Sequence, residues 1–322
     1  MEVSRTAFLA DLTTSEGRLH RFTAISRIIA PRAAISSDRL RSLIQEEVKL
    51  TNTKVIRRHI RAMQSLGLIE RSDIGYILSS EGKALCELTT PNLASEPELA
   101  EKVFYLRALA FHLPVQFTSM LLAIFENVDK SKERVISSYG QKVLPTSTWT
   151  DKTKTDLRTT LLGQPDLPPR KVQNNFDCFR LWLRQLELVR PDPLRLTRTG
   201  QMMVEIAAQQ ASEIRDKIYW VAAAYMGGAP PQLPRFNYDD DSDRQLFLKL
   251  LHRGYERFER PELRLSDVRS ISVYVCIVML VEGHRILDEA SFWQLVNQLL
   301  RDRRIGSILA GRDGKAAYIT LG

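Results

Sequence analysis

The expected order of elements in the N-terminal part of the chain rests on residues 51–85, "TNTKVIRRHIRAMQSLGLIERSDIGYILSSEGKAL". Apolar residues recur at helical spacing from Ile56 to Leu66, and Gly67 favours an end to the helix because glycine tolerates the left-handed conformation. A short apolar run, a polar break and an alternating run follow. The pattern predicts a helix, a short strand, a turn at 73–75, a second strand and a new helix.

The first of these helices carries a row of positive charge, which we call the basic stripe: Lys54, Arg57, Arg58 and Arg61. Their spacing puts all four side chains on one face. The opposite face is apolar and carries Ile56, His59, Ile60, Met63 and Leu66. Helix faces usually mix signs, because opposite charges four residues apart stabilise a helix by about 0.2–0.5 kcal/mol. No acid lies between Val48 and Leu68, so the stripe indicates a surface for a polyanion, and an ordinary solvated face is the alternative. Thr51 or Thr53 is the expected helix cap.

Two further helices are predicted upstream, at 19–30 and at 36–48. The order of helix, helix, turn, helix and hairpin, with the signature "LGLIER…YILSSEGKAL", resembles the winged helix-turn-helix superfamily over about residues 18–88. The resemblance implies that residues 15–90 form a winged-helix domain. It also implies that the third helix can lie in the major groove of DNA, with the hairpin as the wing beside it.

The pattern then recurs, because residues 183–206 can be laid over residues 63–88. Leu186 matches Leu66, and Gly200 matches Gly82, each glycine standing three residues after a hydroxyl side chain. The second hairpin is two residues shorter than the first. We expect a second winged-helix domain at 144–210.

A looser third copy closes the chain. Residues 288–305 predict a capped amphipathic helix, and two short alternating runs follow it, with Asp313-Gly314 as a hairpin turn. The expected architecture is therefore mainly α with short β-hairpin wings, as tandem winged-helix domains joined by helical spacers. The third unit is expected at 265–322, and the spacers at 91–143 (helical) and 211–264 (helical and loop).

The composition is that of an ordinary globular protein with a moderate positive excess. The 322 residues are too many for one core of usual size, so two or three domains are expected. Forty-six basic against 38 acidic residues give a net charge of +8, which permits a polyanionic partner without requiring one. Cys86, Cys178 and Cys276 lie far apart without metal spacing, which is typical of buried thiols in a reducing compartment.

No targeting segment is visible in the sequence. Residues 1–18 lack the pattern of an export signal. The most apolar run, 271–281, is shorter than the ~20 residues needed to cross a bilayer, so it predicts a helix buried inside a domain. We expect a cytoplasmic protein with no membrane partner.

Patterns that carry enzyme chemistry are missing from the sequence. It contains no glycine-rich phosphate loop, no nucleophile elbow and no HExxH motif. The five histidines sit in separate elements, and the acidic residues at 239–243 are interpreted as solvated loop acids. We therefore expect no catalytic residues, no metal and no cofactor.

The sequence favours a sequence-reading or structural DNA-binding protein with double-stranded DNA as its partner. The candidate contacts of the first unit are Asn52, Thr53, Lys54, Arg57, Arg58, Arg61, Arg71 and Lys83, and those of the second unit are Arg170, Lys171, Arg180 and Arg184. The third helix of the second unit is mixed in sign with Trp182 beside it, so a protein-binding face is equally open there.

The alternative is a docking subunit. Tandem winged helices also resemble accessory subunits of condensin-type ATPase complexes and of other multi-protein machines. This alternative implies a protein partner or a homo-oligomer. Transcription regulation and a component of antiviral defence or of a mobile element both remain compatible with the sequence.

Overall fold

The computed structural model describes residues 18–89, 96–147, 150–209, 213–227, 233–260, 262–310 and 317–320. Within these residues the chain is mainly helical, with small antiparallel sheets. The first group of elements, which we call the N-terminal unit, consists of α1 (Leu19–Ile29), α2 (Ser37–Glu47), α3 (Thr53–Ser65), β1 (Ile69–Ser72), β2 (Gly75–Leu78) and α4 (Ser80–Leu88). Strands β1 and β2 pair antiparallel, so the expected helix, hairpin and helix are present.

The central helix α5 (Leu99–His112) leads to the second unit. This unit consists of α6 (Pro114–Glu126), α7 (Lys132–Val143), the 3-10 turn η1 (Leu144–Thr146), α8 (Asp151–Gly163), α9 (Arg170–Gln185), β3 (Val189–Pro191), β4 (Leu194–Leu196) and α10 (Arg198–Gln209). Helix α7 packs against α8 and α9. A helix expected in the first spacer therefore belongs, by its contacts, with the second unit.

Helices α11 (Glu213–Ala222) and α12 (Ala224–Gly227) connect to the C-terminal unit. That unit consists of α13 (Asp241–Phe258), β5 (Glu259–Arg260), β6 (Leu265–Asp267), α14 (Val268–Val281), α15 (Glu289–Arg301), β7 (Ser307–Ala310) and β8 (Ala317–Thr320). Its strands form one sheet in the order β5-β6-β8-β7. Strands β5 and β6 were not expected from the sequence, and the turn expected at Asp313-Gly314 lies outside the described residues.

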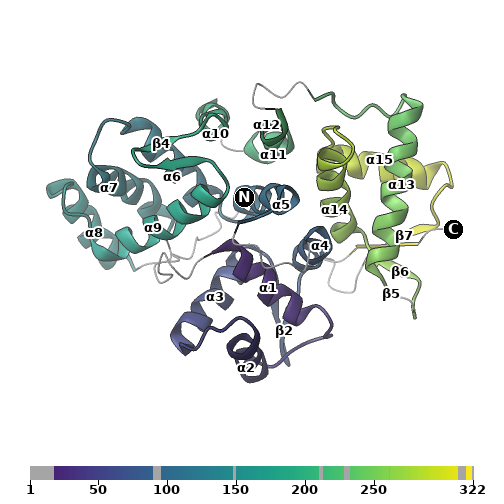
Figure 1. Ribbon diagram of the computed structural model, residues 1–322, viewed down its shortest axis with the longest axis horizontal. Helices are drawn as coiled ribbons and strands as arrows, with labels where there is room; N and C mark the ends of the chain where they lie inside the picture. Colours follow the sequence, from purple (N-terminus) through teal and green to yellow (C-terminus); the bar gives the residue numbers. More distant parts are fainter. Residues whose placement is uncertain are drawn as a thin grey trace.

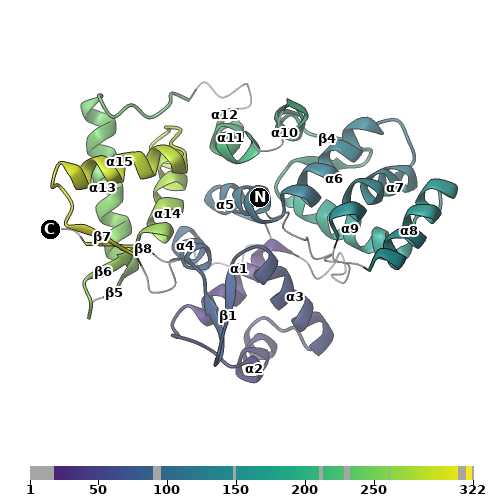
Figure 2. The same ribbon diagram turned by 180° about the vertical axis from the view of Figure 1, so that it is seen from behind.

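The three units surround α5, which lies at the centre of both views (Figure 1 and Figure 2). Helix α5 contacts α4, α6, α11 and α14. Helix α14 is buried along almost its whole length, between α13, α4, α5 and α15, as expected for the apolar run 271–281. Trp182 is fully buried and meets the ring of Phe22 edge-on at 5.7 Å. The expectation that Trp182 flanks an exposed face is wrong, because this indole joins the second unit to α1.

Three helices in this chain end in the same way. In each, an N–H bonds back to a carbonyl five residues earlier, at 2.8–2.9 Å: Leu68 to Met63, Leu188 to Leu183, and Arg304 to Leu299. The residue just before each donor has a positive φ: Gly67 at 70°, Glu187 at 54° and Arg303 at 56°. This C-terminal capping motif turns α3, α9 and α15 into the strand that follows.

The first two units also share the start of the next helix. The Ser79 hydroxyl accepts from the Gly82 N–H at 3.0 Å and donates to the Gly67 carbonyl. Thr197 repeats both bonds, with Gly200 at 3.2 Å and with the Glu187 carbonyl at 2.6 Å. The sequence match between 63–88 and 183–206 is therefore a match of local structure.

Among the described residues, no single helix has the length and apolar character to cross a membrane. Helices α5 and α6 reach that length and character only as a pair, and the chain bends by 105° between them.

Candidate nucleic-acid interface

The basic stripe lies on the outer face of α3. Lys54, Arg57 and Arg61 are exposed and Arg58 is half-buried. None of the four makes an ion pair with another residue in the part of the chain that the structure describes. The opposite face is packed into the core, with Val55, Ile56, His59, Ile60, Ala62 and Met63 buried.

The start of α3 is capped by Asn52. Its side-chain oxygen accepts from the Lys54 N–H at 2.9 Å and from the Val55 N–H at 3.4 Å. The expectation that Thr51 or Thr53 caps the helix is wrong, because Asn52 is the residue directly before the helix and its side-chain oxygen accepts from these donors. Asn52 and Thr53 directly precede Lys54, at the N-terminal end of the stripe. Asn52 is exposed and Thr53 is half-buried.

The hairpin beside α3 is mixed in charge. Arg71 on β1 is exposed and stands opposite Tyr76. Glu70 and Asp73 are exposed on the same hairpin. Since the acids offset Arg71, the continuous positive surface of this unit is α3 itself.

Lys83 lies at the contact between α4 and α14. Its Nζ is 3.6 Å from Asp267 Oδ2, and Asp267 caps the start of α14 by accepting from the Arg269 N–H at 3.1 Å. The structure therefore gives this lysine an acidic partner in the C-terminal unit, and does not group it with the stripe.

In the second unit the corresponding helix carries an acid that pairs with two cations. Asp177 on α9 lies 3.1 Å from the Lys132 ammonium and 3.3 Å from the Arg180 guanidinium. Arg170, Lys171 and Arg184 are exposed on α9. Of the candidate contacts of the second unit, Arg180 therefore has an acidic neighbour on its own helix.

The shared ends of α3, α9 and α15 allow position-by-position comparison. The four stripe positions are occupied in α9 by Asn174, Asp177, Cys178 and Leu181, and in α15 by Ala290, Trp293, Gln294 and Asn297. Neither set contains a cation. The packing of such a helix does not require positive charge on this face, and among these three helices only α3 carries the four cations.

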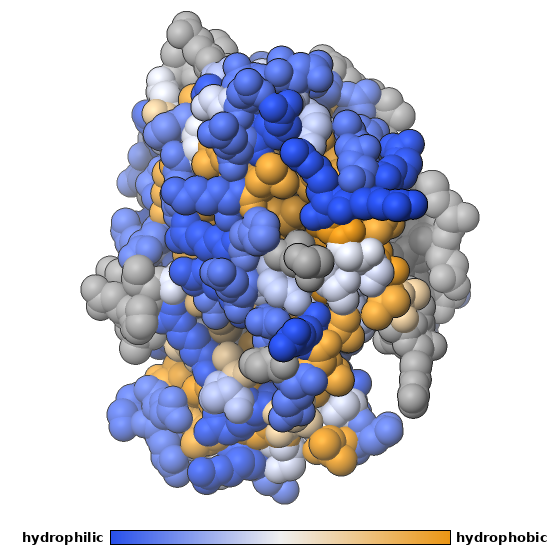
Figure 3. Space-filling model, turned by 90° about the vertical axis from the view of Figure 1, so that its right-hand side faces the viewer, coloured by the Kyte–Doolittle hydropathy of each residue, from blue (hydrophilic) through white to orange (hydrophobic). Residues whose placement is uncertain are grey.

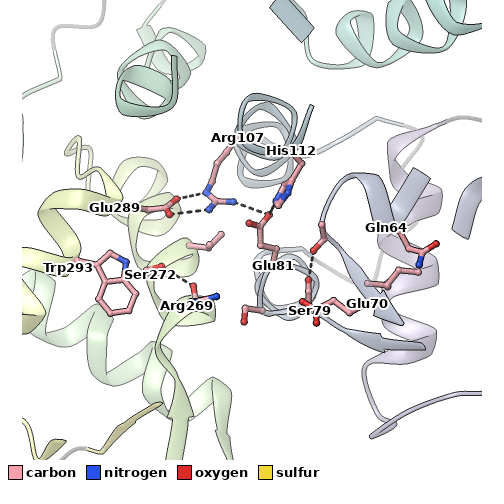
Figure 4. A pocket seen from close by; sticks show the side chains of 14 residues that line it. Gln64, Glu70, Ser79, Glu81, Arg107, His112, Arg269, Ser272, Glu289 and Trp293 are labelled. Atoms are coloured by element: carbon pink, nitrogen blue, oxygen red, sulfur yellow. Dashed lines mark hydrogen bonds and ion pairs between the residues drawn. The ribbon is translucent and has the colours of Figure 1, made fainter. Parts of the chain in front are cut away.

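The N-terminal and C-terminal units meet at a buried group of charges. The Arg107 guanidinium on α5 lies 3.0 Å from Glu81 Oε2 and donates to both carboxylate oxygens of Glu289, with the Oε2 bond at 3.1 Å (Figure 4). His112 Nε2 is 2.8 Å from Glu81 Oε2, and the Tyr219 hydroxyl donates to Glu289 at 3.0 Å. Arg107 is almost fully buried, so its two carboxylates replace lost hydration.

These contacts shift proton affinities. Burial acts to raise the pKa of Glu81, but Arg107 and His112 outweigh it and hold this pKa below its ordinary value. Burial likewise acts to lower the pKa of Arg107, and the two carboxylates raise it well above the ordinary value. Glu81 and Arg107 are therefore both charged around neutral pH.

A cavity of 620 Å³ adjoins this group. One wall comes from the end of α3 and from β1, with Gln64 and Glu70, and the other from α14 and α15, with Arg269 and Trp293 (Figure 4). This site and the charges beside it were not expected from the sequence. No local pattern signals it, because its residues come from elements far apart in the chain.

Of the acidic residues at 239–243, Asp239, Asp240 and Asp241 are exposed, as expected, but Asp243 is not. Asp240 caps α13 by accepting from the Ser242 N–H at 2.9 Å. Asp243 is buried and accepts from Arg285 at 2.8 Å and from the Asn237 N–H at 2.9 Å. The expectation of solvated acids is wrong for Asp243. Among the described residues no group of three or more His, Cys, Asp or Glu side chains is arranged to hold a metal ion.

No protein-family model matches the chain, and no significant match is found among curated proteins or solved structures.

Proposed function

We propose that this protein binds double-stranded DNA through α3 of an N-terminal winged helix. The observation that carries the proposal is the basic stripe: four cations on one helix face, with no ion pair to any described residue and with no counterpart on α9 or α15. Unpaired cations aligned on a helix suit the phosphates of a duplex, and arginine can also pair with guanine in the major groove.

The hairpin has a secondary part in this proposal. Arg71 can contact a phosphate, but Glu70 and Asp73 repel the backbone. The helix therefore supplies most of the electrostatic attraction. Lys83 does not contribute, because Asp267 already neutralises it.

Salt dependence tests the proposal. Each neutralised phosphate adds about −0.9 to the slope of log K against log salt concentration, so the four stripe cations give a slope of about −3 to −4. Fluorescence anisotropy of a labelled blunt duplex, titrated at several salt concentrations, measures this slope. Absence of binding at low salt, or an affinity that does not respond to salt, would exclude the proposal.

A docking role is the second candidate, and the C-terminal sheet favours it. Strand β7 is an edge of that sheet, contains no charged residue, and exposes Leu309 at 46%. Such an edge can accept a strand from a protein partner. Figure 3 shows hydrophobic residues exposed between hydrophilic ones on this side of the molecule. Binding at an apolar strand edge would change little with salt, which separates the two candidates.

A further inference from the structure

We propose that the cavity between α3 and α15 accepts an unpaired base at the end of the bound duplex, with Trp293 as its stacking surface and Arg269 as a phosphate contact. This inference rests on the proposed function and extends it. It names the substrate as duplex DNA that carries a single-stranded tail.

The basic stripe leads to this cavity. Arg57, Arg61 and Gln64 follow one another at i, i+4 and i+7, so they form one row along α3. Gln64 is exposed and lines the cavity. A DNA backbone that follows the row of Arg57, Arg61 and Gln64 toward the end of α3 therefore arrives at the mouth of the cavity.

The opposite wall offers the groups that an unpaired nucleotide needs. Trp293 is half-buried on α15, at the position that Arg57 occupies on α3, and its indole lines the cavity. Arg269 is exposed on α14, and its guanidinium makes no ion pair with a described residue. An aromatic ring stacks on any base, and an adjacent cation neutralises its phosphate.

The size of the cavity fits one nucleotide. Its 620 Å³ lies within the range of about 300–1,000 Å³ typical of small-ligand sites, and it is too small for a duplex. Glu81 and Glu289 also line it; Arg107 pairs with both, but its single positive charge offsets only one of the two negative charges. Glu70 is the remaining acid of the lining, and no described cation pairs with it. Glu70 therefore opposes a phosphate at this wall.

The test compares a blunt duplex with the same duplex carrying a short single-stranded tail, labelled with 2-aminopurine at the first unpaired position. We expect the parent protein to bind the tailed duplex about tenfold more tightly, the effect of one stacked base, and to quench the 2-aminopurine. Trp293→Ala should remove this preference and the quenching while leaving blunt-duplex affinity unchanged. Trp293→Phe should retain both, and Glu70→Gln should strengthen binding of the tail.

The outcomes separate the two proposals. Equal affinity of the parent for both duplexes, or a preference that survives Trp293→Ala, would overturn this inference and leave blunt-duplex binding by the stripe intact. If the parent protein binds neither duplex, the proposed function is overturned as well. Thermal melting of each variant checks folding. If Trp293→Ala melts at a lower temperature than the parent, Trp293→Phe, which keeps an aromatic ring, provides the test instead. If Trp293→Phe then binds the tailed duplex no more tightly than the blunt duplex, the proposal is overturned.

Discussion

Gly82 on α4 lies against the main-chain oxygen of Leu68, so closely that a Cβ at residue 82 would come within 3.0 Å of it. Gly200 stands in the same relation to Leu188 in the second unit. Real Cβ atoms essentially never approach a neighbour so closely. The glycine in each copy therefore lets the helix after the hairpin pack onto the turn that precedes the hairpin.

Gly82→Ala should destabilise the protein, because the obstructing atom belongs to the main chain and can move only with the turn. We expect a loss of about 1–3 kcal/mol in the free energy of unfolding, typical of an overpacked site. Gly200→Ala should behave alike. Gly163→Ala is the matched control, since a Cβ there meets nothing within 4 Å. Denaturant unfolding measures all three, and a Gly82→Ala variant as stable as Gly163→Ala would refute the close approach.

Arg107→Met should destabilise the protein by about 3 kcal/mol, because it leaves the half-buried Glu81 and Glu289 without their cation. Adding Glu81→Gln and Glu289→Gln to Arg107→Met should recover part of the loss. Arg134→Met removes an exposed arginine that pairs with Asp166, and we expect no measurable change from it. Equal melting temperatures for Arg107→Met and Arg134→Met would mean that the buried group does not hold the units together.

Glu81 should make the protein sensitive to acid. Because its pKa in the folded state lies below the ordinary value of 4.5, its contribution to stability is present above that value and is lost as pH falls through the folded pKa. Unfolding free energies measured from pH about 6 down to about 3 should fall more steeply for the parent than for Glu81→Gln. Parallel curves would contradict the ion pair of Glu81 with Arg107 and its hydrogen bond with His112.

The contribution of Glu101 to stability should change with pH in the opposite direction to that of Glu81. Burial raises its pKa above the ordinary value of 4.5, although a hydrogen bond from Thr23 acts to lower it. Its contribution is therefore present below the ordinary value and is lost as pH rises through the folded pKa. Glu101→Gln keeps an oxygen for Thr23 without a buried charge, so it should be more stable than the parent at neutral pH. A less stable variant at pH about 7 would show that the carboxylate is stabilised in its charged form.

Local patterns in the sequence predicted the local structure of this chain. The spacing of apolar residues, Gly67 and the hydroxyl-to-glycine match of Ser79 and Thr197 were sufficient to place α3, α9 and the hairpins that follow them. These signals lie within a few residues of the structure that they determine, so no knowledge of the tertiary fold was needed.

Contacts between distant elements could not be predicted in the same way. Lys83 and Trp182 carry the residue types of an exposed binding surface, but Asp267 pairs with the lysine and Phe22 covers the indole. Asp243 belongs to an acidic run but is buried against Arg285. In each case the partner comes from a remote part of the chain, and burial depends on how the units pack.

Duplex binding by the basic stripe is tested by the quadruple change of Lys54, Arg57, Arg58 and Arg61 to alanine. The matched control removes the same charge from the helix of the second unit, by changing Arg170, Lys171, Arg180 and Arg184 to alanine. Each stripe side chain points away from the core, so its loss should change stability by less than ~0.5 kcal/mol, which thermal melting checks.

Duplex binding at several salt concentrations then decides. We expect the stripe variant to bind weakly, with its salt slope reduced by roughly three to four, and the control to retain most of the parent's affinity and slope. A well-folded stripe variant that binds duplex DNA with the parent's affinity and salt slope would show that the basic stripe does not contact the DNA.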